Sequence, residues 1–71
     1  MYDAIIEPIP GHEYARKEDA LYQVVVIERD GMGRVMRRMW IEDTDLTHDK
    51  AGSVWNQVRQ RLQNPKRGTD K

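Results

Sequence analysis

The stretch YQVVVIERDGMGRVMRRMWIED, residues 22–43, constrains the fold more than any other part of the chain. Its β-branched run VVVI favours a pleated strand over a helix. Asp30, Gly31 and Gly33 then supply the backbone freedom that a tight reversal needs. The stretch therefore predicts an antiparallel β-hairpin over about residues 21–42.

Both faces of this hairpin carry apolar residues, if the loop has three residues (30–32). The first face then holds Leu21, Gln23, Val25, Ile27, Val35, Arg37, Met39 and Ile41. The second face holds Tyr22, Val24, Val26, Glu28, Arg34, Met36, Arg38 and Trp40. The loop length sets the cross-strand pairs, whereas alternation alone sets the face of each residue within its strand.

A C-terminal helix is predicted over about residues 47–63. Its apolar residues follow the 3.6-residue period and form one stripe: Ala51, Val54, Trp55, Val58 and Leu62. Thr47 is the expected N-cap, and Pro65 stops the helix near Gln63. One helix of ~16 residues can cover one face of a small sheet, and the other face then needs a different cover.

The N-terminal part contributes a third strand. Residues 3–9 can pair at a sheet edge, where Pro8 loses no ladder hydrogen bond. The sequence thus predicts an α+β domain over residues 1–63, with a three-stranded antiparallel sheet (edge strand plus β-hairpin) packed on the helix. Residues 64–71 are expected to form a disordered basic tail.

Length and composition narrow the class of protein. A chain of 71 residues has room for a single small core. The absence of cysteine excludes disulfides and thiolate metal sites, and it agrees with a reducing compartment. The chain begins without a signal peptide and has no apolar run long enough to span a bilayer, so we expect a cytoplasmic protein with no membrane partner. Twelve basic and twelve acidic residues balance, which argues against general polyanion binding.

Catalytic and metal-binding patterns are weak. Ser53 and His48 lie five residues apart on the predicted helix, which is a poor spacing for proton transfer. His12 and His48 each precede an acidic residue, but nothing in their spacing requires a metal, and both are expected to be exposed to solvent. The sequence therefore predicts a non-enzymatic protein without a cofactor.

The strongest polar signal is the arginine-rich return strand. Arg34 and Arg38 share the second face with Trp40 and Tyr22. Three interpretations stay open. Arginine beside aromatic rings suits a protein interface, it suits phosphate contacts and base stacking, and it also suits a buried aromatic pair ringed by arginine side chains.

The more uniformly aliphatic first face is the expected seat of the helix, and the alternative is that the helix takes the Trp40 side and leaves the first face outward. With the helix on the first face, the second face would then be covered by another polypeptide, either a heterologous protein or a second copy of the chain in a homodimer. The alternative is that the 10–20 loop folds back with Tyr14 and shields it. The predicted partner-binding residues are Tyr22, Val24, Arg34, Met36, Arg38 and Trp40.

The function expected from these features is protein–protein interaction, as in the small regulatory adaptors or inhibitors that phages and mobile elements encode. The alternative is a nucleic-acid-binding module, for instance one that binds DNA, which would use the Arg/Trp-rich hairpin face.

Overall fold

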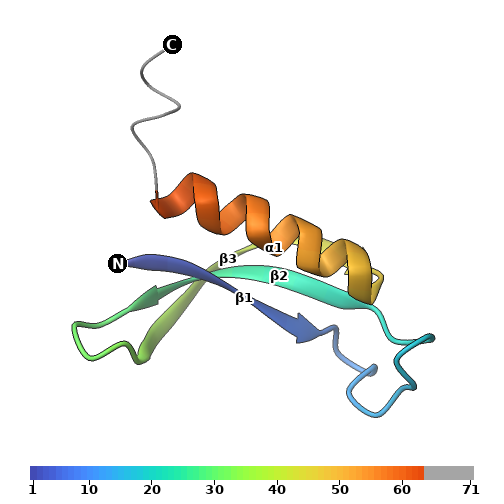
Figure 1. The fold of residues 1–71 in the computed structure, drawn as a ribbon. Coiled ribbons are helices and arrows are strands. Elements are labelled where there is room, and N and C mark those ends of the chain that lie inside the picture. Colours follow the sequence, from blue (N-terminus) through green and yellow to red (C-terminus); the bar gives the residue numbers. More distant parts are fainter. Residues whose placement is uncertain (64–71) are drawn as a thin grey trace.

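The computed structural model describes residues 1–63, which form a three-stranded antiparallel sheet with one helix packed against it (Figure 1). The strands lie in the order β1 (Tyr2–Pro8), β2 (Tyr22–Arg29) and β3 (Val35–Leu46), and the chain then enters helix α1 (His48–Gln63). The predicted α+β fold is confirmed. The predicted tail, 64–71, lies outside the described residues.

Strand β1 occupies one edge of the sheet, as predicted. It pairs only with β2 in the described part of the chain, and Ala4 lies opposite Val26. Pro8, which has no N–H group to donate, is the last residue of this edge strand. Within residues 1–63, no helix combines the length and apolar character that crossing a membrane requires.

The hairpin loop is longer than predicted. It spans residues 30–34, because the Asp30 carboxylate accepts hydrogen bonds from the N–H groups of Met32 (2.9 Å) and Arg34 (3.0 Å). Gly33 takes a φ of 87°, which a side chain would disfavour. The predicted pairing was wrong: the longer loop and the register shifts that follow it place Val26 opposite Trp40, and not opposite Met36.

Strand β3 is irregular and extends beyond the predicted end of the hairpin. Its twelve residues continue to Leu46, which lies opposite Tyr22. The pairing of β2 with β3 shifts register at several points, one of them between Val26 and Ile27. Such bulges change which side of the sheet a residue faces, so simple alternation does not hold along β3.

Thr47 caps the start of helix α1, as predicted. The Thr47 hydroxyl accepts a hydrogen bond from the Lys50 N–H (3.4 Å), and its carbonyl accepts one from the Ala51 N–H (2.8 Å). These contacts satisfy N–H groups that the first turn would otherwise leave unpaired. The helix then runs across one face of the sheet (Figure 1).

The prediction that the helix covers the first face was wrong. The buried cluster under the helix contains Ala4, Val24, Val26, Leu46, Ala51 and Val58, and Tyr22, Met39, Val54, Trp55 and Leu62 pack against it. The helix thus covers the side of β2 that holds Val24 and Val26, the predicted second face. Small Ala4 on β1 lies in this cluster, which leaves space for the larger helix side chains.

The loop between β1 and β2 does not shield the sheet. Tyr14 is fully exposed, so the alternative in which it folds back over the second face was wrong. The loop is instead held by its own hydrogen bonds, including one from the Leu21 N–H to His12 Nδ1 (3.2 Å). This bond leaves His12 partly buried, although both histidines were expected to be exposed; His48 is exposed.

Candidate functional site

Strand β3 presents most of the exposed apolar side chains of the sheet. It forms the second sheet edge, and four of its large side chains are about half exposed or more: Val35 (50 %), Met36 (58 %), Trp40 (47 %) and Ile41 (53 %). Met36 and Trp40 belong to the predicted partner-binding set. A run of this kind along an open strand edge is typical of a contact surface.

Trp40 is held in place by neighbours on three elements. Its ring meets that of Tyr2 on β1 edge to face, with centroids 6.5 Å apart. Its Nε1–H donates to one carboxylate oxygen of Glu42 (2.9 Å), and Arg61 of the helix donates to the other (2.7 Å). The hydrogen bonds from Trp40 and Arg61 hold the pKa of Glu42 below its ordinary value. The half-exposed indole is therefore positioned before any partner arrives.

The arginines of the return strand all have acidic partners within the chain. Arg34 lies 3.4 Å from Asp30, and Arg37 lies 2.8 Å from Glu28. These guanidinium groups stay well exposed, so they can still contact a partner at the rim of the apolar surface. Each arginine is nevertheless neutralised locally, which weakens the positive potential that a nucleic acid would meet.

Arg38 lies apart from Trp40, although the sequence places both on one face. Its guanidinium group donates to both oxygens of Glu7 (2.8 and 2.6 Å), and Glu7 also accepts a hydrogen bond from Gln23. Because Glu7 is on β1 and Arg38 is on β3, this ion pair spans the central strand. The bulge between Val26 and Ile27 accounts for the separation.

This polar bridge lies on the face of the sheet opposite the helix. Gln23 alternates with Val24, and Val24 packs under the helix. On the open face Val25 and Ile27 are nevertheless only 1 % and 0 % exposed. The face opposite the helix is thus closed to water over Val25 and Ile27, where the Arg38–Glu7–Gln23 bridge crosses the central strand, and a partner is not required there.

Two predicted contact residues lie in or against the core. Val24 is fully buried, so it cannot touch a partner without opening the fold. Tyr22 packs against the core cluster, and its ring meets the exposed ring of His48 edge to face, with centroids 5.6 Å apart. Met36 and Trp40 are instead exposed on β3, as are Val35 and Ile41, and the Tyr2 ring lies against Trp40. Trp40 lies opposite Val26 and Ile41 opposite Val25, so these exposed side chains lie on both sides of the β3 edge. We call Tyr2, Val35, Met36, Trp40 and Ile41 the β3 surface.

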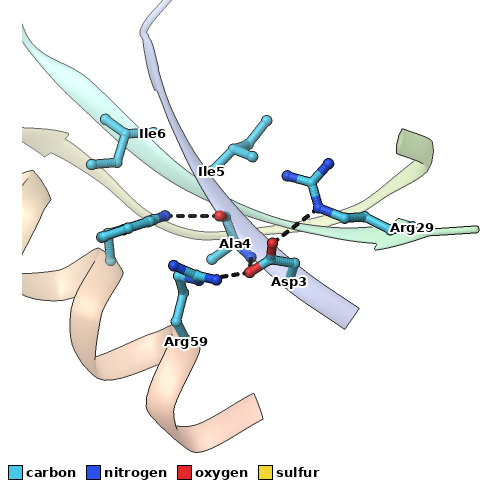
Figure 2. Close-up of a pocket in the computed structure, with 7 residues that line it drawn as sticks. Asp3, Ala4, Ile5, Ile6, Arg29 and Arg59 are labelled. Atoms are coloured by element: carbon cyan, nitrogen blue, oxygen red, sulfur yellow. Dashed lines mark hydrogen bonds and ion pairs between the residues drawn. The ribbon is translucent and has the colours of Figure 1, made fainter. Parts of the chain in front are cut away.

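A second feature lies at the β1 edge, where the Asp3 carboxylate sits between two arginines (Figure 2). Arg29 Nε donates to one oxygen (3.0 Å) and Arg59 Nε to the other (2.8 Å). The guanidinium carbon of Arg59 also lies 4.7 Å from the ring centroid of Trp55, a cation–π contact. These residues line a hollow of about 390 Å³.

The Asp3 carboxylate is almost entirely buried, and it stays ionised. Burial raises its pKa, but hydrogen bonds from the Ala4 N–H, Arg29 and Arg59 lower it by more in sum, so its pKa falls below the ordinary value. A carboxylate held this way is a poor proton donor at neutral pH. The cluster ties β1 to β2 and the helix, and a structural role is sufficient to explain it.

Sequence reasoning missed this cluster because its members are far apart in the chain. Asp3 and Arg29 are separated by 26 residues, and Asp3 and Arg59 by 56. The one sequence pattern that pointed to this cluster is the alternation in β1, which puts the acidic residues Asp3 and Glu7 on the opposite side from Ala4.

The described residues offer little for catalysis. Within residues 1–63, no three His, Asp or Glu side chains gather closely enough to hold a metal ion. His48 Nδ1 lies 3.6 Å from the fully exposed carboxylate of Asp49, at the start of the helix. This exposed pair lacks the positioned nucleophile that a hydrolytic site needs.

Fold and surface together define a small α+β domain with an exposed apolar edge strand. Comparison of the chain with models of protein families, with curated proteins and with solved structures finds no match. The function is therefore inferred from the surface of the chain itself.

Proposed function

We propose that this protein is a non-enzymatic binding protein that acts through protein–protein contact, with the β3 surface as its interface. The observation that carries the proposal is the exposure of Val35, Met36, Trp40 and Ile41 along an edge strand. Trp and Met are enriched at protein interfaces, and Arg34 and Arg37 supply a polar rim. A cytoplasmic location belongs to the same proposal, since the chain contains no cysteine.

The β3 surface favours a protein over a nucleic acid as the ligand. The three arginines of the return strand are each paired with a carboxylate, and the whole chain has no net charge. A nucleic-acid interface depends on uncompensated cations that displace counterions from phosphates. The apolar side chains, in contrast, lose unfavourable contact with water when any complementary polypeptide covers them.

Trp40→Ala is expected to weaken partner binding by about 2 kcal/mol, roughly 30-fold, because a half-exposed, positioned indole has the character of an interface hot spot. The measurement is an affinity pull-down from cells that produce the protein, followed by titration of the captured partner against wild type and variant. Tyr14→Ala is the matched control, because Tyr14 is a fully exposed aromatic residue outside the β3 surface.

Equal losses for Trp40→Ala and Tyr14→Ala would overturn the assignment of the interface to β3. Capture that disappears after nuclease treatment and falls steeply with salt would instead support the nucleic-acid function.

A further inference from the structure

The charges along β3 divide into two blocks of opposite sign on either side of Trp40. The N-terminal block contains Arg37 and Arg38, with Arg34 just before the strand, and the C-terminal block contains Glu42, Asp43 and Asp45. Neither block contains a charge of the other sign. A strand with this pattern is complementary to a second copy of itself running in the opposite direction.

The outer edge of β3 is also the more open of the two sheet edges. On β1, the Ala4 N–H donates to the Asp3 carboxylate, and the Ala4 carbonyl accepts a hydrogen bond from Trp55 Nε1 (both 2.8 Å). Pro8 removes a further donor from that edge. Strand β3 pairs only with β2 among the described residues, so its outward backbone groups have no strand neighbour.

We propose that β3 pairs antiparallel with β3 of a second copy, around a two-fold axis at Trp40. The two three-stranded sheets then join into one sheet of six strands. This proposal rests on the proposed function and names its partner. In this register Arg37 of one copy lies opposite Asp43 of the second copy, and both residues lie opposite β2 residues on the helix side of the sheet, Glu28 and Val24.

The same register brings apolar residues together. Trp40 lies opposite Trp40 of the second copy at the axis, so the centre of the contact is aromatic and its flanks are charged. A parallel arrangement in register would place Arg37 against Arg37 and Asp43 against Asp43. Like charges directly opposite each other destabilise a strand pair, so the charge blocks select the antiparallel direction.

The contacts that β3 makes within its own chain allow this pairing. Arg37, Arg38 and Glu42 have intrachain partners, but the arginine side chains are 66 % and 53 % exposed. Exposed ion pairs contribute little to stability and exchange partners readily. Register shifts lie on both sides of the Trp40–Ile41 pair in β3, so the paired segment is short and irregular, and we expect a reversible dimer and not a permanent one.

The test uses two charge reversals, Arg37→Glu and Asp43→Arg, in the full chain. Each variant alone places two like-charged pairs in the dimer, so its dissociation constant should rise at least about 30-fold over wild type in sedimentation equilibrium. An equimolar mixture restores both pairs. The introduced glutamate of one chain then meets the introduced arginine of the other, and the unchanged Asp43 of the first chain meets the unchanged Arg37 of the second. The mixture should therefore associate about as well as wild type. Arg16→Glu, an exposed reversal in the loop between β1 and β2, should leave the constant unchanged.

Three results would overturn the inference: wild-type protein that stays monomeric at all concentrations, single variants that dimerise like wild type, or a mixture that fails to associate. Far-ultraviolet circular dichroism of each variant shows whether its fold is intact. The double variant carrying both reversals in one chain should also recover dimerisation. A monomeric wild type that still binds a heterologous protein through Trp40 would reject the dimer and leave the proposed function standing.

Discussion

Ile27→Ala should lower the free energy of unfolding by about 3 kcal/mol, which is a large part of the total stability expected for a chain of this size. Ile27 is the largest fully buried side chain, although it lies on the face of the sheet that the helix does not cover. Its burial depends on neighbouring strands and on the bridge from Arg38 to Glu7. Removing its side chain leaves a cavity that a sheet cannot readily close.

Ile41→Ala is the matched control, since Ile41 has the same side chain and lies opposite Val25 on the same face, but is 53 % exposed. The Ile41→Ala substitution should lower the free energy of unfolding of the monomer by less than about 1 kcal/mol. Urea unfolding followed by tryptophan fluorescence measures both variants, and 3 kcal/mol corresponds to a shift of roughly 2–3 M in midpoint for a small domain. Equal effects for Ile27 and Ile41 would show that the polar bridge does not seal the open face.

The order and type of the elements followed from local patterns. The β-branched run at 24–27 predicted a strand, and the apolar stripe from Ala51 to Leu62 predicted the helix. Thr47 marked the start of that helix, because a hydroxyl there can satisfy the first free N–H groups. These features depend on residues close in sequence, so the sequence alone is enough to reveal them.

The register and the choice of face depended on interactions that local patterns do not contain. Asp30 lengthened the hairpin loop through its side chain, and the bulge after Val26 moved Arg38 and Trp40 to different surroundings. Both faces of β2 are apolar, so its own alternation does not say which one the helix takes. The residues that decide which face the helix covers lie on β1: Ala4 is small enough to lie under the helix, and Glu7 on the other side needs a polar partner.

The exposure of the predicted partner-binding residues was correct in part, and their role in binding stays a prediction. Met36 and Trp40 stand on the exposed edge, and Arg34 lies at its hairpin end. Tyr22 and Val24 were assigned to the same surface because alternation was extended across an irregular pair of strands. Tyr2 was missed, since its contact with Trp40 crosses the central strand and cannot be inferred from either strand alone.

Asp3→Asn is expected to cost about 2 kcal/mol at neutral pH, because it removes the charge that two arginines share while keeping the shape of the side chain. Arg29 and Arg59 are partly exposed, so water compensates some of the loss. Asp19→Asn is the control, since Asp19 is exposed in the loop between β1 and β2, and its effect should stay within about 0.5 kcal/mol.

The difference in stability between wild type and Asp3→Asn should depend on pH in a defined direction. The pKa of Asp3 is lower in the folded protein than its ordinary value, so the unfolded chain takes up the proton first as the pH falls. The stabilisation is therefore complete above about pH 5, and it disappears progressively as the pH falls below about 4 and through the folded pKa. Glu7 and Glu42 also have lowered pKa values, but they are present in both proteins and largely cancel in the difference. Urea unfolding of the two proteins at pH 7, 5, 4 and 3 would measure this difference in stability. A difference that stays constant down to pH 3 would mean that the charge of Asp3 contributes nothing.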